Sequence, residues 1–145
     1  MGHHLAAIPA RFVVCLTMIV GAFASPPAAR AQDETLPTFV KGKFDVPLNH
    51  EVVKQEWQAL GYSRCQYEGK EQGWTSERPE RHKGEHTHPW YVMYAGKAGK
   101  MEFIIDDRRF VLEPGDELYY PKDAVIAARN LHDGRSDWFA CWKYQ

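Results

Sequence analysis

Hydrophobic residues recur at helical spacing in one short stretch of the chain. Val53, Trp57 and Leu60 stand at positions i, i+4 and i+7, which places them on one face of a helix. Asn49 is a residue type that caps the start of a helix, and Gly61 is a type that ends one. The pattern therefore predicts one short helix between these two residues, packed through its apolar stripe on the rest of the domain.

From Tyr62 onward the hydrophobic pattern changes to short β-type runs separated by turn residues. Asp106-Asp107 and the stretch 113–116 have the chemistry of tight turns that join neighbouring strands. An even number of strands in hairpin order favours two antiparallel sheets packed face to face. We expect an all-β fold, a small antiparallel double-sheet jelly-roll barrel with an interior pocket. The predicted strands span residues 62–67, 72–76, 86–95, 100–105, 108–112, 117–120, 124–129 and 137–144.

The N-terminal 31 residues have the pattern of a secretory signal peptide. Arg11 precedes an apolar run over 12–24, and Ala29-Arg30-Ala31 supplies small residues at the positions that a signal peptidase reads. The run of about 13 residues is too short to cross a hydrocarbon core of about 30 Å. We expect cleavage after Ala31, with cleavage after Ala24 as the weaker alternative. The mature protein would then be periplasmic or secreted, without a membrane anchor.

The mature chain is predicted to have a lead-in and one domain. Residues 32–48 carry Pro37 and Pro47 and read as an extended lead-in that runs along the domain as an edge strand. Residues 49–145 form the barrel domain. Loss of the signal peptide removes two of the 18 basic residues and no acid, which leaves 16 against 19 acidic residues, a net charge of −3. Basic and acidic residues are interleaved, which argues against nucleic acid or anionic lipid as the main partner and leaves small molecules and proteins.

Two cysteines remain in the mature chain, Cys65 and Cys141. An even pair in an exported protein suits a disulfide, which would stabilise the fold by roughly 4 kcal/mol for a loop of that span. Both residues suit the role of small buried apolar side chains in two strands equally well. The sequence leaves the two interpretations open.

Two histidines stand one residue apart in the predicted strand 86–95. Because strand side chains alternate between faces, His86 and His88 are expected to face the same interior. The stretch 77–85 before them is the densest run of charges in the chain and is expected at the mouth of the barrel. It is either a solvated loop or part of a substrate clamp.

These histidines open a spacing that resembles the first motif of the cupin superfamily of small β-barrels. That motif is similar to His-x-His, three or four residues, Glu, six residues, Gly, and here His86, His88, Val92 and Gly99 fall on its positions. Valine stands in the place of the glutamate.

The second cupin motif resembles Gly, five residues, Pro-x-Gly, two residues, His, three residues, Asn. In this chain its places are taken by Gly115, Pro121, Asp123, Ile126 and Asn130. Isoleucine stands in the place of the histidine, and Asp123 in the place of a turn glycine. The resemblance implies the cupin barrel for the part of the chain that holds the two motifs.

A metal-binding cupin uses three histidines and one glutamate, so the resemblance implies a metal site that has lost half its ligands. Val92 and Ile126 cannot ligate a metal, and two imidazoles alone hold a divalent ion such as Mn, Fe, Ni, Cu or Zn weakly. Extra donors would be required. The candidates are His82 and Glu85 on the approach loop and Tyr94 on the alternating face of the histidine strand.

Alternation also defines a candidate pocket. Trp90, Val92 and Tyr94 share the predicted face of the histidines, and Ile126 and Asn130 share a face of the second motif. Together they describe an apolar and aromatic cavity suited to a small organic ligand, although each aromatic residue taken alone fits plain core equally well.

Several functions are consistent with this pattern. The first is an exported protein that binds a small molecule in the barrel, with or without a weakly held divalent metal at His86 and His88. The second is a divergent metal-dependent enzyme, an oxygenase, isomerase or lyase, with a recruited third ligand. A histidine pair without metal can also transfer protons, but no carboxylate partner is identifiable from the sequence. The last is a structural module that forms a homodimer through exposed-edge aromatics, Trp138 and Trp142.

Overall fold

The computed structural model describes residues 35–76 and 86–144. The chain divides into two units, residues 1–31 and 32–145, and all described residues lie in the second unit. The predicted signal peptide and the charged stretch 77–85 lie outside the described residues. Within the described part of the chain, no helix is long and apolar enough to cross a membrane.

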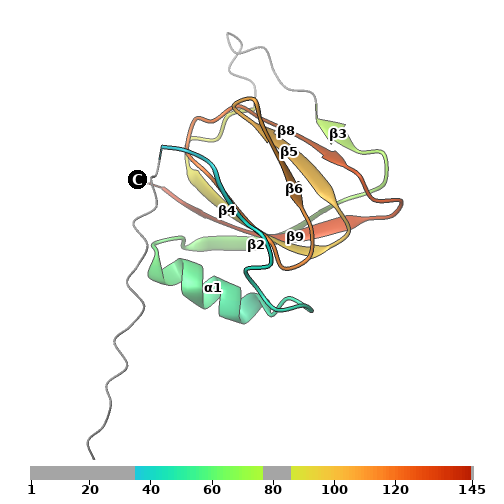
Figure 1. Cartoon of the computed structure of the whole chain (residues 1–145). Coiled ribbons are helices and arrows are strands. Elements are labelled where there is room, and N and C mark those ends of the chain that lie inside the picture. The colour runs from blue at the N-terminus through green and yellow to red at the C-terminus, as the bar shows by residue number, and fades with distance from the viewer. Residues whose placement is uncertain (1–34, 77–85, 145) are drawn as a thin grey trace, which may run out of the picture. The chain divides into compact units, whose positions relative to one another are not determined.

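The second unit is built of two antiparallel sheets and one helix (Figure 1). One sheet has five strands in the order β1-β7-β4-β9-β2, and the other has four in the order β3-β8-β5-β6. The elements are β1 Thr38–Val40, α1 His50–Ala59, β2 Arg64–Lys70, β3 Thr75–Ser76, β4 Tyr91–Ala98, β5 Met101–Ile105, β6 Arg108–Leu112, β7 Glu117–Tyr120, β8 Ile126–Asn130 and β9 Ser136–Lys143.

The prediction of an all-β double-sheet jelly roll with one short helix is confirmed, and the lead-in does supply an edge strand, β1. Closure into a barrel is not seen: the described strands form two separate sheets that meet through their side chains. The edge strands β1 and β3 have only three and two residues, which is too little backbone to build a ladder from one sheet to the other.

The helix begins and ends where the sequence predicts. The Asn49 side chain accepts a hydrogen bond from the Glu51 N–H at 3.2 Å. At the other end, Gly61 has a φ of +91°, its N–H donates to the Gln58 carbonyl, and the Tyr62 N–H donates to the Trp57 carbonyl. These two hydrogen bonds form the Schellman motif, which needs the left-handed conformation that glycine adopts easily. Leu60, predicted in the buried stripe, is instead 40% exposed because it is the capping residue where the helix turns away.

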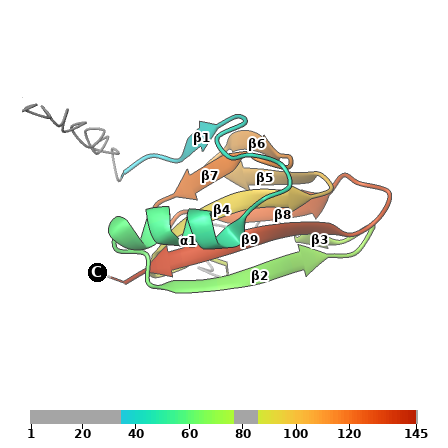
Figure 2. The ribbon, with the colours of Figure 1, turned by 90° about the horizontal axis from the view of Figure 1, so that it is seen from below.

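Each face of the five-stranded sheet packs against a different layer. Helix α1 lies along the outer face (Figure 2). Its Val53 and Trp57 join the cluster that contains Met93 and Phe139, with the Trp57 and Phe139 rings stacked 6.0 Å apart. The inner face carries the larger core, shared with the four-stranded sheet. Its buried members are Val92, Tyr94, Met101, Phe103, Ile105, Leu112, Leu118, Tyr120, Ala124, Trp138 and Ala140.

Trp138 and Trp142 are therefore not the exposed-edge aromatics that the sequence analysis expected. Trp138 is 3% exposed, and Trp142 packs against the inner core. Both alternate onto the inner face of β9, the strand that lies between β4 and β2. The homodimer stays a prediction without these two residues as its basis.

The positions that the two motifs share with cupins have backbone roles. Gly99, Gly115 and Asp123 all have a positive φ, of 74°, 86° and 63°. A side chain on Gly99 would also collide with Ser136, so this turn after β4 needs glycine for space as well as conformation. Asp116, 1% exposed, accepts hydrogen bonds from the backbone N–H groups of Gly42 and of its own turn, which fastens the lead-in to the hairpin.

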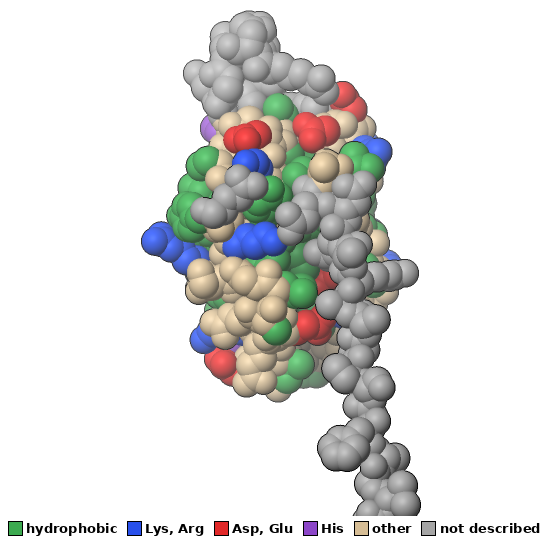
Figure 3. All heavy atoms as spheres, turned by 90° about the vertical axis from the view of Figure 1, so that its left-hand side faces the viewer, with side chains coloured by type: hydrophobic (Ala, Val, Ile, Leu, Met, Phe, Trp, Pro, Cys, Tyr) green, Lys and Arg blue, Asp and Glu red, His purple; other side chains and the backbone are tan. Residues whose placement is uncertain are grey.

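On the face shown in Figure 3, the acidic and basic side chains of the described residues are interspersed with hydrophobic ones.

Candidate functional site

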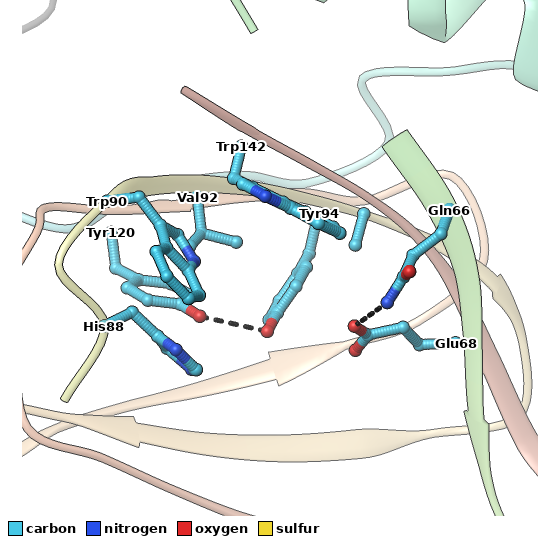
Figure 4. A pocket seen from close by; sticks show the side chains of 9 residues that line it. Gln66, Glu68, His88, Trp90, Val92, Tyr94, Tyr120 and Trp142 are labelled. Atoms are coloured by element: carbon cyan, nitrogen blue, oxygen red, sulfur yellow. Dashed lines mark hydrogen bonds between the residues drawn. The ribbon is translucent and has the colours of Figure 1, made fainter. Parts of the chain in front are cut away.

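A pocket of about 220 Å³ lies on the inner face of the five-stranded sheet (Figure 4). Its walls come from β2, from the segment that leads into β4, and from β4, β7 and β9. The lining residues are Gln66, Glu68, His88, Trp90, Val92, Tyr94, Tyr120, Ala140 and Trp142.

Aromatic rings form one side of this pocket. The His88 imidazole stacks on Trp90 with ring centres 5.3 Å apart and planes 26° apart. Trp90 in turn lies 6.5 Å from Trp142, with planes 29° apart, and 5.4 Å from Tyr144. The result is a continuous aromatic wall that holds the histidine ring in place.

Two tyrosine hydroxyls lie together deep in the pocket. The Tyr94 and Tyr120 oxygens are 3.0 Å apart, and both side chains are buried. Burial raises the pKa of both hydroxyls, and the nearby Glu68 carboxylate raises them further, so both remain protonated. Only one proton can lie between the two oxygens, so the pair has a second O–H to donate.

Glu68 is the carboxylate of the site. Its Oε2 accepts from Trp138 Nε1 at 3.0 Å, and its Oε1 accepts from Gln66 Nε2 at 3.0 Å. Figure 4 shows Glu68 and His88 on opposite sides of the pocket, with the tyrosine pair between them. No carboxylate partner for the histidines was identifiable from the sequence, and the structure places Glu68 in the same pocket as His88.

The sequence analysis missed Glu68 because the predicted strand ended at residue 67 and no motif includes this residue. Strand β2 runs on to Lys70, paired with β9 along its whole length. The signal that could have found Glu68 is simple alternation: it follows Gln66 by two residues and faces the same side.

His88 is half-buried and uncharged near neutral pH. Burial lowers the pKa of its imidazole, the neighbouring His86 lowers it further, and the Glu68 carboxylate partly opposes both effects. The backbone at this position is fixed from the second motif, because the Asp123 N–H donates to the His88 carbonyl at 2.7 Å. A neutral imidazole offers the pocket one donor and one acceptor.

His86 does not share this position, and the prediction that both histidines lie on one strand is wrong. Strand β4 begins only at Tyr91, while His86 lies in a turn with a φ of 153°, and Thr87 makes an isolated bridge to Val125. Pro89 has no N–H to offer a ladder, which explains why the strand cannot extend back to the histidines. Among the residues that line the pocket, His88 is present and His86 is not.

The donor set of the described residues does not fit a metal centre. No group of three His, Cys, Asp or Glu side chains that could hold a metal ion occurs within residues 35–76 and 86–144. Of the proposed replacement ligands, Tyr94 is a protonated phenol that is hydrogen-bonded to Tyr120, and a phenol in that state is a poor ligand. His82 and Glu85 lie outside the described residues.

The predicted pocket residues separate into two groups. Trp90, Val92 and Tyr94 line the cavity, with period two preserved from His88 onward. Ile126 packs in the inner core, and Asn130 is the last residue of β8, next to the turn that leads to β9. The Asn130 amide donates to the carbonyls of Lys70 and Gly134. Its oxygen accepts from the His132 N–H and from Ser136 Oγ, so these four bonds use its hydrogen-bonding capacity.

A disulfide joins Cys65 and Cys141, which oppose each other in the register of β2 and β9. The sequence left open a disulfide or two buried thiols, and the structure contains the disulfide. The bond lies on the outer face of the sheet, one residue from Gln66 and from Trp142, which point into the pocket on the inner face.

The described part of the chain is a double-sheet jelly roll with an aromatic pocket. Solved structures to which the chain is similar include cupin proteins. The Cupin 2 conserved barrel domain protein from Salinispora arenicola is 22% identical, with a TM-score of 0.45 over 55% of this chain and 60% of that one.

Two further similar structures are a protein from Photorhabdus luminescens and the DMSP lyase DddQ from Ruegeria pomeroyi. The first is 18% identical, with a TM-score of 0.47, and the second is 22% identical, with a TM-score of 0.46. The match covers 56% of this chain and 62% of the Photorhabdus protein, and 55% of this chain and 36% of the lyase. At these identities the likeness concerns the fold alone. No family model and no curated protein matches the sequence.

Proposed function

We propose that this protein is exported and binds a small organic molecule in the pocket of its five-stranded sheet. The observation that supports the proposal is the convergence of Glu68, His88 and the tyrosine hydroxyl pair on one cavity with an aromatic wall. A few directed polar groups in a mainly apolar cavity are the general composition of small-molecule sites. The volume of about 220 Å³ is below the usual range for drug-sized ligands, so the ligand is a small metabolite.

Binding in this proposal needs no resident metal. A weakly held divalent ion at His86 and His88, and a divergent metal-dependent enzyme built on it, stay predictions that depend on donors outside the described residues. The described donors supply hydrogen bonds and one negative charge instead.

The proposal is tested by thermal unfolding of the mature protein, purified without an affinity tag, against a panel of amines, amino acids, sugars, nucleosides and organic acids. At a hundred times its dissociation constant, a ligand that binds only the folded state stabilises it by about 2.7 kcal/mol. We expect at least one compound to raise the melting temperature. The same preparation is analysed for Mn, Fe, Ni, Cu and Zn, and we expect far less than one metal ion per chain.

A matched pair of variants locates the binding. Gln66 and Gln55 are both exposed, but only Gln66 lines the pocket. Gln66→Trp should fill the cavity and abolish the stabilisation, while Gln55→Trp, on the helix, should leave it unchanged. A panel without any binder, or a Gln66→Trp variant that binds as well as the wild type, would contradict the proposal. Stoichiometric metal that is lost in His86→Ala/His88→Ala would instead favour the metal-dependent alternative.

A further inference from the structure

The side of β2 that faces the pocket carries both signs of charge. Residues two apart on a strand share a face, so Arg64, Gln66, Glu68 and Lys70 project from the same side of β2. Gln66 and Glu68 line the pocket, and the two cations flank them along the strand. An ion pair between Glu68 and either neighbour would be the ordinary outcome of this pattern.

The two cations lie on aromatic rings instead. The Arg64 guanidinium carbon is 4.9 Å from the centre of the Tyr144 ring, and Lys70 Nζ is 4.9 Å from the centre of the Trp74 ring. Both distances are within the range of favourable cation–π contacts. Neither basic side chain is therefore turned toward the carboxylate.

Glu68 is left with neutral partners. Its two hydrogen bonds within the described part of the chain come from the Trp138 indole and the Gln66 amide, and no Lys or Arg described by the structure forms an ion pair with it. A carboxylate offers about four acceptor positions, so capacity remains for a further donor. The pocket accordingly contains one negative charge without a matching positive charge from these residues.

The rest of the pocket favours a cation rather than merely tolerating one. Trp90 and Trp142 line the cavity with their ring planes 29° apart, and the face of an indole attracts a cation. The half-buried His88 imidazole stacks on Trp90 and lies on the opposite side of the pocket from Glu68. The tyrosine hydroxyl pair adds a donor, which suits a hydroxyl or ether oxygen on the same ligand.

We propose that the ligand of this pocket is a small organic ammonium ion, held by the Glu68 carboxylate and the ring faces of Trp90 and Trp142. The inference rests on the proposed function and names the chemical class of its ligand. An ammonium group next to Glu68 supplies the charge that Arg64 and Lys70 do not. A hydroxyl a few bonds away accepts the free hydrogen of the tyrosine pair.

Two probes that differ in charge but not in shape provide the test. Choline carries a trimethylammonium group, and 3,3-dimethylbutan-1-ol carries a neutral tert-butyl group in its place. Isothermal titration of the tag-free mature protein should show about tenfold tighter binding of choline, a difference of about 1.4 kcal/mol. Glu68→Gln removes the charge and keeps one oxygen to accept from Trp138, and its NH₂ group can donate to the Gln66 amide oxygen once that amide turns over. It should reduce the preference severalfold, to the part that the indole rings supply.

Control variants separate charge recognition from damage to the fold. Glu56→Gln makes the same chemical change on the helix, outside the pocket, and should keep the full preference for choline. Trp142→Leu should weaken choline severalfold, because it removes a ring face while the carboxylate stays. Near-ultraviolet circular dichroism of each variant confirms the native packing.

The outcomes distinguish this inference from the proposed function. Equal affinity for the two probes, a preference that Glu68→Gln leaves unchanged, or no choline binding at about 10 mM would each overturn the ammonium ligand. If a neutral compound of the panel still binds in the wild type and not in Gln66→Trp, the proposed pocket function stands without it. If no compound binds at all, both are wrong.

Discussion

Glu117 lies buried between α1 and the outer face of the five-stranded sheet. Trp57 Nε1 donates to its Oε2 at 2.9 Å, and the side chain is almost fully enclosed. Burial raises the pKa of this carboxyl above its ordinary value of 4.5, and the Trp57 hydrogen bond and the charge of Lys43 only partly offset the effect. This residue makes the stability of the fold depend on pH.

The sign of the dependence follows from proton linkage. The folded state binds the Glu117 proton more tightly than the unfolded state does, so ionisation of Glu117 costs stability. The contribution is most favourable below the unfolded value near 4.5 and is lost as the pH rises through the raised pKa. Glu117→Gln keeps an acceptor for Trp57 and should lack this decline.

Urea unfolding at a series of pH values measures the effect. Relative to the wild type, Glu117→Gln should gain stability as the pH increases from 4.5 upward across this window. Glu71→Gln, the same change at an exposed position, should keep the wild-type profile. A Glu117→Gln profile parallel to that of the wild type would show that burial at this position does not shift the pKa.

Residue-scale prediction from the sequence succeeded where a side chain serves its own turn or cap. Asn49, Gly61 and the turn role of Asp116 follow from local chemistry. The place of Glu68 in the site was not predicted, because it depends on which strands lie beside β2. The pairing of β2 with β9 joins residues some seventy positions apart. Short-range pattern contains no information about that neighbour.

At the scale of elements, β2 is the critical strand of the site. It lies at an edge of its sheet, is paired on one side by β9, and supplies both Gln66 and Glu68 to the pocket. The disulfide between Cys65 and Cys141 ties this edge strand to the centre of the sheet. We expect the bond to stabilise the fold and to hold the pocket wall in position.

Cys65→Ala/Cys141→Ala should lower the free energy of unfolding by about 4 kcal/mol, the chain-entropy value for a closed loop of this length. Affinity for any ligand of the pocket should fall as well, because β2 then has no covalent link to β9. Chemical denaturation and titration of the variant measure both effects. Reduction of the wild-type protein serves as an independent removal of the bond, and unchanged stability in both cases would contradict a structural role for it.

The start of β4 shows the limit of element prediction. Period-two alternation correctly ordered the side chains from His88 to Tyr94, yet the hydrogen-bonded strand begins only at Tyr91. Alternation of side chains needs only extended backbone, whereas a strand needs a partner, and Pro89 withholds its donor. For this reason His86 does not line the pocket.

At the scale of the whole chain, export is the prediction that links the N-terminus to the fold. The disulfide suits an oxidising compartment, where such bonds persist. The full chain expressed in a bacterial host should be recovered from the periplasm, cleaved after Ala31, as intact mass would show. The exported protein should have no free thiol.

Two comparisons make this test decisive. The variant Ala29→Arg/Ala31→Arg should block cleavage at this site. The chain from Gln32 onward, produced in the reducing cytoplasm, should have two free thiols. Recovery of the intact full chain in the cytoplasm would contradict the signal peptide.

Fold class was within reach of the sequence at this scale because hairpin order, turn chemistry and helix caps all agree on one architecture. The separation of the two sheets was not. The sheets stay separate because β1 and β3 are too short to join them, and strand length at an edge is set by packing rather than by pattern.

The arrangement of tryptophans in the two layers has a practical consequence for optical measurements. Trp90 and Trp142 border the pocket, whereas Trp57 packs between the helix and the outer face of the sheet, and Trp138 lies in the inner core. Quenchers dissolved in the buffer should therefore reach the first two indoles before the second two. The fluorescence of the pocket tryptophans should report occupancy of the cavity, and that of the core tryptophans should report integrity of the fold. Replacement of single tryptophans by phenylalanine would separate the two signals without any dye.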